Sequence, residues 1–380
     1  MKVYFDNAAT TIVRPEAVDA MVRVMRENYG NPSSMHEQGR TARAELEAAR
    51  STIAMSMGAS PDSILFTSGG TEANNIAVLG TSGSFKHKGK HIITSAIEHS
   101  AILDPIKKLE NEGFEVTYLM PDRAGVITGD AFSAALRNDT VFASVMFVNN
   151  ETGVKNPVND YVNEIKRRGL STILHTDAVQ GLCKIPFTVN SLGADLISVS
   201  SHKLHGPKGV GALYIKKGIK TSPLILGGSQ EKGNRGGTEA LPAAVGFSEA
   251  VSLGMLERDN NFAAVNSLRE YVSRLLEYEV PEAVLLVGGN NICSPYILPI
   301  SLPGYKSEVL MNFLDGESVF VSRSAACKKG ARSRTLEAMD FTDEVIDGAL
   351  RISFSRYNTK EEIEYFIQVL KNATAKLIRT

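Results

Sequence analysis

The sequence has 380 residues, of which 43% are hydrophobic, and a formal net charge of -1. This length predicts two domains, or one large domain with an appended lobe, and the near-neutral charge gives no general attraction to nucleic acid or acidic membranes. No apolar run approaches membrane-spanning length, and three cysteines are too few for a disulfide framework, so we expect a cytoplasmic protein.

The chain begins with a short apolar run at residues 3–6, which a small polar turn follows. Helical periodicity covers residues 17–25, and a stronger helical stretch at residues 41–57 ends before Gly58. Between the two helices lies GNPSSMHEQGR, a segment rich in turn-forming residues. We interpret this segment as a connection or as a functional loop, because loops of α/β proteins often carry function.

A strand at residues 64–67 is followed by the turn Ser68-Gly69-Gly70-Thr71 and a helix at residues 73–79. Glycines let the backbone approach an anion, and the free N–H groups of a helix start favour negative charge. The pattern therefore indicates a phosphate site, although ordinary strand-to-helix turns share it. It lacks the lysine of a nucleotide P-loop and the spaced glycines of a dinucleotide fingerprint.

The alternation of strands and helices then continues, with helical segments at residues 100–112 and 156–168. Further strands are predicted at residues 91–95, 115–119, 141–148, 172–176, 196–199 and 212–215. This pattern predicts a large, mostly parallel, doubly wound sheet. Polar residues follow the strand ends, and carboxyl ends of parallel strands meet at one crevice. The residues that we expect to converge there are His99, Asn150, Asp177 and Lys203.

These residue types match the needs of one cofactor, pyridoxal 5′-phosphate (PLP). Asp177 offers a carboxylate to a pyridinium nitrogen, His99 offers a flat ring, and Lys203 offers an amine for a Schiff base. The candidates for the phenolate oxygen and the phosphate are Gln180, Thr71, Ser200 and His202. Taken singly, Lys203 also fits a solvated loop residue, and His99 or Asp177 fits a helix cap.

Motifs along nearly the whole chain resemble those of the cysteine desulfurases, which are fold-type I PLP-dependent enzymes of the class V aminotransferase group. The matching segments are FDNAATT (5–11), GNPSSMHEQGR (30–40), FTSGGTEANN (66–75), IEHSA (97–101), VNNETGV (148–154), HTDAVQ (175–180), SSHKLHGPKG (200–209), GGSQEKGNRGGTEA (227–240) and RISFSRYNT (351–359). The resemblance implies a large PLP-binding domain at residues 13–255. Residues 1–12 and 256–380 would form a smaller α/β domain.

The resemblance also implies a role for individual residues. Lys203 and His99 would be catalytic, Asn150 would orient substrate and ring, and Arg351 would bind the substrate carboxylate. Thr238 would reach the phosphate in the neighbouring subunit of a homodimer. The phosphate ligands of the same subunit would be Gly70, Thr71, Ser200 and His202, with Asp177 and Gln180 on the ring. We expect no bound metal.

Cys327 would be the third catalytic residue. Small residues before it and a glycine after it favour an exposed, mobile loop, and the neighbouring Lys328 and Lys329 favour its thiolate. By resemblance, the thiolate would take the sulfur of L-cysteine as a persulfide and alanine would be released, for iron–sulfur cluster assembly or thiolation. The spacing to Arg351 resembles the long-loop subgroup.

The run Arg323-Ser324-Ala325-Ala326 before Cys327 departs from the Ser-Gly-Ser-Ala-like pattern of the family. The basic residues of this loop form either a solvated surface or a docking surface for an acidic partner, such as a sulfur acceptor or scaffold protein. The two other cysteines, Cys183 and Cys293, lie in apolar or turn contexts and are expected to be structural.

Other functions on the same scaffold stay open at this point. Selenocysteine cleavage and transamination would not depend on attack by Cys327. A non-catalytic scaffold relative would be marked by loss of Lys203 or Asp177, and both residues are present.

Overall fold

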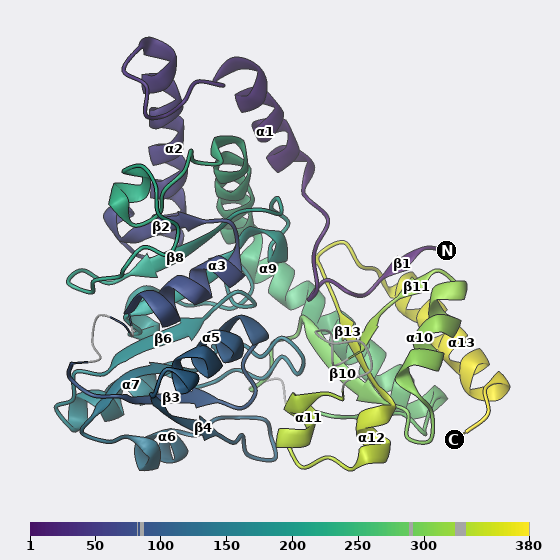
Figure 1. Ribbon diagram of the computed structural model, residues 1–380. Coiled ribbons are helices and arrows are strands. Elements are labelled where there is room, and N and C mark those ends of the chain that lie inside the picture. The colour runs from purple at the N-terminus through teal and green to yellow at the C-terminus, as the bar shows by residue number, and fades with distance from the viewer. Residues whose placement is uncertain (82, 84–86, 289–291, 324–331, 380) are drawn as a thin grey trace.

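The computed structural model describes residues 1–81, 83, 87–288, 292–323 and 332–379 (Figure 1). Its helices are α1 (Pro15–Glu27), α2 (Glu37–Ser56), α3 (Gly70–Asn75), α5 (Ser100–Asn111), α6 (Gly129–Ala135), α7 (Val158–Arg167), α8 (Val189–Leu192), α9 (Leu241–Glu279), α10 (Ser307–Gly316), α11 (Arg334–Ala338), α12 (Asp343–Asp347) and α13 (Lys360–Lys376). Short helical turns are η1 (Pro61–Ser63), η2 (Ile76–Gly80), η3 (Ser201–Lys203) and η4 (Gln230–Gly233). In the described part of the chain, every helix is too short or too polar to cross a membrane.

The large sheet has seven strands in the order β2-β8-β7-β6-β5-β3-β4. These strands are β2 (Ile64–Thr67), β3 (His91–Ser95), β4 (Glu115–Leu119), β5 (Thr140–Ser144), β6 (Ile173–Asp177), β7 (Leu196–Ser200) and β8 (Gly211–Ile215). All neighbouring pairs are parallel except those of β8, which runs antiparallel to both β2 and β7. The predicted mostly parallel sheet is confirmed.

Successive residues of each strand enter different hydrophobic cores, as the two-residue period of a strand requires. In β7, Leu196 packs with α3 and α5 on one face, whereas Ile197 packs with α1, α2 and α7 on the other. Both faces of the sheet are therefore covered by helices, which explains the nearly continuous apolar strands of the sequence.

The smaller sheet is antiparallel, with the order β12-β13-β10-β9, and a parallel pair β1-β11 accompanies it. Its strands are β1 (Val3–Tyr4), β9 (Val284–Leu285), β10 (Ile297–Ser301), β11 (Val319–Phe320), β12 (Ser322–Arg323) and β13 (Ala349–Ser353). Val3 pairs with Val319, so the first residues lie with the C-terminal part of the chain (Figure 1). This placement brings the FDNAATT segment between the two sheets.

Helix α9 runs from beside α1 and α2 to the small sheet and α13 (Figure 1). Its first half places Phe247 in the core of the large sheet, and its second half places Val272 in the core of the small one. The sequence predicted a helix only from residue 255, whereas α9 begins at Leu241. A Cβ atom on Gly246 would lie 2.6 Å from the Met21 side chain, so the packing of α9 on α1 favours glycine at this position. The domain boundary at 255, which falls inside α9, stays a prediction.

Two other element boundaries differ from those predicted. Helix α2 begins at Glu37 rather than at residue 41, because the His36 side chain accepts a hydrogen bond from the Gly39 N–H and caps the helix. Strand β5 ends at Ser144 rather than at residue 148. The apolar residues beyond it are still buried, in the connection that carries Asn150.

Candidate active site

A cavity of about 340 Å³ lies at the carboxyl ends of β3, β6 and β7. It also receives the FDNAATT segment and one residue of β13. Sequence-predicted residues that line it are Gly70, Thr71, His99, Asn150, Asp177, Gln180, Ser200, His202, Lys203 and Arg351. The predicted convergence of strand-end residues is therefore present in the structure.

One end of the cavity is formed by the turn between β2 and α3 and by the end of β7. A Cβ atom on Gly70 would lie only 2.9 Å from a methyl group of Val179, so this position requires glycine. The buried Ser200 hydroxyl has no hydrogen-bond partner among the described residues. A ligand with acceptor oxygens, such as a phosphate, would complete its hydrogen bonding.

His202 lies at the same end, where its Nδ1 is 3.2 Å from the Thr10 hydroxyl. Burial lowers the pKa of His202 to about 4, and the charge of Lys203 adds to this effect. The imidazole is therefore neutral near pH 7, when it carries one N–H donor.

Asp177 ends β6 and is held by two donors. Its Oδ2 accepts a hydrogen bond of 2.6 Å from the Asn74 side chain, and its Oδ1 accepts one of 2.9 Å from the Val179 N–H. Asn74 was not among the predicted site residues, although it lies in the quoted segment FTSGGTEANN. The two donors fix the carboxylate at the cavity wall as an acceptor.

His99 caps helix α5, because its Nδ1 accepts a hydrogen bond of 3.1 Å from the Ala101 N–H. His99 therefore caps a helix, which was one of its two predicted roles, and its ring also lines the cavity. Burial lowers the pKa of His99; the carboxylate of Asp177 opposes this shift, and Lys203 reinforces it. A neutral ring is suited to stacking on a planar ligand.

Lys203 follows β7 in the turn η3, and its ammonium group faces the N-terminal segment. Its Nζ donates to the backbone carbonyls of Ala8 and Ala9, both at 2.6 Å. The Thr11 N–H also bonds to the His202 carbonyl at 3.0 Å. The FDNAATT motif therefore forms the wall opposite the lysine, a role that the sequence pattern alone did not reveal.

Arg351 comes from β13 of the small sheet and is only 2% exposed. Its Nη2 donates to Asp6 Oδ1 at 2.8 Å, and its Nη1 donates to the Asn150 carbonyl at 3.0 Å. Its Nε has no hydrogen-bond partner among the described residues. Two nitrogens of the Arg351 guanidinium are thus held by hydrogen bonds at the cavity, and its Nε remains a potential donor.

Thr238, another predicted site residue, lines a separate cavity of about 120 Å³ beside Ser68 and Gly209. The prediction for Cys327 concerns a residue outside the described part of the chain. The other cysteines are buried, and burial raises the pKa of the Cys183 thiol to about 12, so it is a poor nucleophile near neutral pH.

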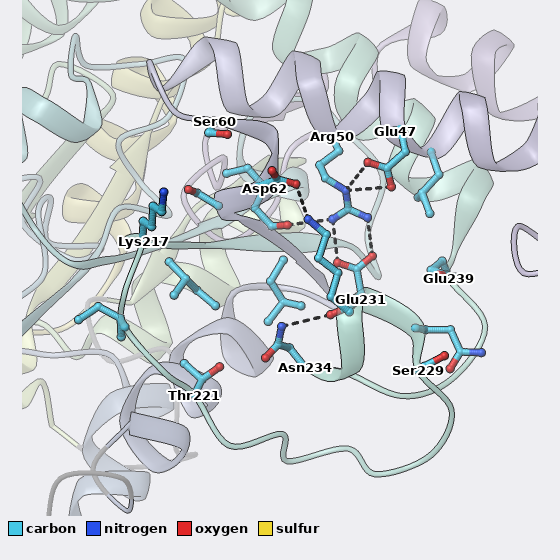
Figure 2. Close-up of a pocket in the computed structure, with 18 of the residues that line it drawn as sticks. Glu47, Arg50, Ser60, Asp62, Lys217, Thr221, Ser229, Glu231, Asn234 and Glu239 are labelled. Atoms are coloured by element: carbon cyan, nitrogen blue, oxygen red, sulfur yellow. Dashed lines mark hydrogen bonds and ion pairs between the residues drawn. The ribbon is translucent and has the colours of Figure 1, made fainter.

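A larger cavity, of about 960 Å³, contains none of the predicted site residues. Figure 2 shows its wall, where Arg50 forms ion pairs with Glu47 and Glu231. Because the residues that match a cofactor line the smaller cavity, size alone does not identify the site.

The smaller cavity fits PLP by its chemistry. The orphaned Ser200 hydroxyl and the glycine turn suit the phosphate, the fixed Asp177 carboxylate suits the ring nitrogen, and Lys203 supplies the amine. The doubly wound sheet and this lysine-centred site define the class of the protein as a PLP-dependent enzyme.

Comparison with known proteins identifies the family. A model of the class V aminotransferases matches residues 3–366, and the chain belongs to this family. Cysteine desulfurase IscS of Dictyoglomus turgidum is 43% identical over 99% of this chain and 95% of that protein. Cysteine desulfurase IscS of Methanosarcina thermophila is 40% identical over 99% of this chain and 92% of that protein. Within the class V aminotransferases, the chain is a member of the cysteine desulfurase family.

The fold comparison agrees with this result. A solved structure described as a NifS-like protein has a TM-score of 0.94 and 37% identity, and the match covers 99% of this chain and 100% of that chain. The predicted fold-type I architecture is confirmed.

Proposed function

We propose that this protein is a PLP-dependent cysteine desulfurase that converts L-cysteine to L-alanine and transfers the sulfur to Cys327. The observation that carries the proposal is the single cavity that brings Lys203, His99 and Asp177 from the large sheet together with Arg351 from the small one. The relatives that bear the name cysteine desulfurase support it.

The cofactor is held by groups of complementary chemistry. Asp177 would accept a hydrogen bond from the protonated ring nitrogen, and Gln180 would donate one to the phenolate oxygen. The Gly70 and Thr71 turn would bind the phosphate, with Ser200 and His202 as further donors. When bound, PLP supplies an electron sink that stabilises negative charge developing next to the amino group of the substrate.

Lys203 anchors the cofactor and then acts as the base that takes the Cα proton of the substrate. The Ala8 and Ala9 carbonyls hold its Nζ at the cavity wall, and they limit how far it moves. Burial lowers the pKa of His99 and favours its neutral form, and this ring would stack against the ring of the cofactor.

Arg351 binds the substrate carboxylate. Its guanidinium already donates to Asp6 and to the Asn150 carbonyl, so its orientation is fixed before the substrate arrives. The amide side chain of Asn150 orients substrate and ring beside it. A buried, preoriented guanidinium favours substrates with a carboxylate next to the amino group, as α-amino acids have.

In the sulfur transfer, the Cys327 thiolate attacks the sulfur of the substrate. The Cβ–S bond breaks and leaves its electron pair on the substrate, an S–S bond to Cys327 forms, and one proton takes the place of sulfur on Cβ. L-cysteine and a thiol thereby become L-alanine and a persulfide, with no external oxidant. An acceptor protein, as in iron–sulfur cluster assembly or thiolation, then removes the persulfide sulfur.

The proposal includes a homodimer in which Thr238 reaches the phosphate site of the neighbouring subunit. Support for it is that Thr238 lies outside the cavity of its own chain. We place the activity in the cytoplasm, where reducing conditions keep the Cys327 thiol available.

The test compares wild type with Cys327→Ala, both supplied with cysteine and dithiothreitol, and measures alanine and sulfide. We expect wild type to form both products and the variant to form neither, while the variant keeps the visible absorbance of bound PLP. Equal activity of the two proteins would overturn the proposal. Selenocysteine and amino-group acceptors would then be the substrates to assay.

A further inference from the structure

Lys184 is a buried lysine that the proposed reaction does not use. It is 7% exposed and lies four residues after Gln180, in the turn that follows β6. Backbone hydrogen bonds from Lys184 and Ile185 to the Gly181 carbonyl make this turn helical in character. Residues at this spacing on a helical turn face the same side.

The surroundings of Lys184 compensate its charge poorly. Its Nζ donates to Gln180 Oε1 at 3.1 Å and lies 5.5 Å from the centre of the Tyr296 ring. No salt-bridge partner of Lys184 exists among the described residues. Burial, reinforced by the charge of Lys203, lowers the pKa of Lys184 to about 7. A buried cation in such a setting costs stability, so a role in the site would account for its presence.

The hydrogen bond to Gln180 fixes which way the carboxamide points. Lys184 Nζ donates to the carboxamide oxygen, so this oxygen faces Lys184 and the NH₂ group faces the other way. On that side Gln180 Nε2 donates to the Ala8 carbonyl at 2.9 Å, and Gln180 lines the cavity. The NH₂ group has a second hydrogen, which is left to bind a ligand atom in the cavity.

We propose that Lys184 is a positioning residue that holds the Gln180 carboxamide as a hydrogen-bond donor to the anionic ring oxygen of the cofactor. The proposal rests on the role proposed for Gln180 above. When Lys184 is protonated, its charge beside the carboxamide oxygen also polarises the amide, which strengthens the N–H donor on the far side. Lys184 therefore acts on the cofactor through Gln180 and without touching it.

The test is a pH titration of the visible absorbance of bound PLP in four proteins: wild type, Lys184→Met, Gln180→Leu and the double variant. Methionine keeps an unbranched apolar side chain at this buried position but removes the donor. The ring oxygen carries more negative charge at high pH, so a weaker donor raises the pH midpoint of the titration. We expect Lys184→Met to raise it by about one unit, a shift typical of weakening one hydrogen bond to a charged oxygen.

The double variant separates a positioning role from an independent one. If Lys184 acts through Gln180, the double variant has the midpoint of Gln180→Leu. A further shift on adding Lys184→Met, or an unchanged midpoint in Lys184→Met alone, would overturn the inference. An unchanged midpoint in Gln180→Leu would instead refute the role proposed for Gln180 itself, and absence of a PLP band in wild type would refute the proposed function.

Two further variants guard against a purely structural effect. Lys184→Gln keeps a neutral donor for the Gln180 oxygen and should retain most of the wild-type midpoint, even if Lys184→Met folds poorly. Lys216→Met removes a lysine that pairs with Asp195 away from the cavity, and it should leave the midpoint unchanged. A Lys184→Gln midpoint as high as that of Gln180→Leu would contradict the positioning role.

Discussion

At the scale of single residues, the guanidinium of Arg351 has hydrogen-bond partners for only part of its donors among the described residues. Asp6 neutralises part of the Arg351 charge from one side, and the Asn150 carbonyl occupies a second donor. The Arg351 Nε has no partner among the described residues. A carboxylate that enters the cavity can complete the hydrogen bonding of this guanidinium, which links its incomplete pairing to substrate binding.

Replacing Arg351 by lysine tests this link. Lysine keeps a positive charge but loses the planar fork, so we expect KM for cysteine to rise roughly 10- to 100-fold, the range for loss of one charged hydrogen bond. Steady-state kinetics measures the change, with Arg23→Lys on the exposed face of α1 as the matched control. A KM within twofold of wild type would contradict the assignment of Arg351 to the substrate carboxylate.

Glu98, next to His99, provides a prediction about pH. Burial raises the pKa of Glu98 to about 8, and the charge of Asp177 adds to the shift, against hydrogen bonds from Ser95 and the Met146 N–H. Between the ordinary pKa of a glutamate and pH 8, the folded protein keeps a proton that the unfolded chain has lost. Stability therefore falls as pH rises through this window, by at most about 1.4 kcal/mol per pH unit.

Glu98→Gln removes this proton exchange while it imitates the protonated carboxyl group. We expect the melting temperature of Glu98→Gln to exceed that of wild type at pH 8 by more than it does at pH 5. Thermal denaturation at several pH values checks the prediction. A difference that does not change with pH would mean that Glu98 is ionised in the folded protein.

The sequence located part of this site because of a simple rule: polar residues after apolar runs mark strand ends, and parallel strands share an edge. That rule brought His99, Asp177 and Lys203 together, as the structure does. The rule did not predict Asn74 or Lys184. Each of them contributes through one hydrogen bond, from Asn74 to Asp177 and from Lys184 to Gln180. Such contacts depend on side-chain directions that periodicity does not contain.

At the scale of elements, the segment η4 is held in a strained conformation. Glu231 and Lys232 both have positive φ, at 46° and 57°, where residues other than glycine are rare. The Glu231 carboxylate binds Arg50 through two hydrogen bonds of 2.7 and 2.8 Å (Figure 2) and also accepts one from the Phe66 N–H. Both side chains of the ion pair are buried. The pair thus ties η4 to α2 and to β2, which leads into the glycine turn.

Breaking this pair should be costly. Glu231→Leu removes the buried carboxylate partner of Arg50 and leaves only the exposed Glu47, so we expect a loss of about 3–5 kcal/mol in the free energy of unfolding. The double variant Arg50→Met/Glu231→Leu should be less destabilised than Glu231→Leu alone, because no uncompensated charge remains. Denaturant unfolding of both proteins measures the difference, and a double variant less stable than the single one would argue against this account.

Helix α9 shows why element boundaries were harder to predict than element types. Its first half is buried against α1 and α2, so residues such as Val245 and Phe247 give no polar face for a helical period to reveal. Tertiary burial, which a local pattern does not report, decides where this helix begins.

At the scale of the whole molecule, the proposed homodimer would let Thr238 of one chain complete the phosphate site of the other. Thr238 follows the η4 segment and sits in its own small cavity beside Ser68, away from Lys203. The sequence suggested its role only through family resemblance, because a residue that acts across an interface leaves no pattern within its own chain. Mixing of subunits distinguishes a Thr238 that binds the phosphate of the neighbouring chain from one that binds the phosphate of its own chain.

We therefore predict complementation between Lys203→Ala and Thr238→Ala at limiting PLP. Lys203→Ala subunits are inactive but carry an intact Thr238, whereas Thr238→Ala subunits carry an intact lysine and bind the phosphate weakly. After unfolding and joint refolding at equal amounts, mixed dimers hold one site with both residues if Thr238 acts across the interface. Half of the dimers are then mixed, so about a quarter of the wild-type activity should return. If Thr238 serves its own chain, no mixed site contains both residues, and activity stays at the average of the two variants measured separately.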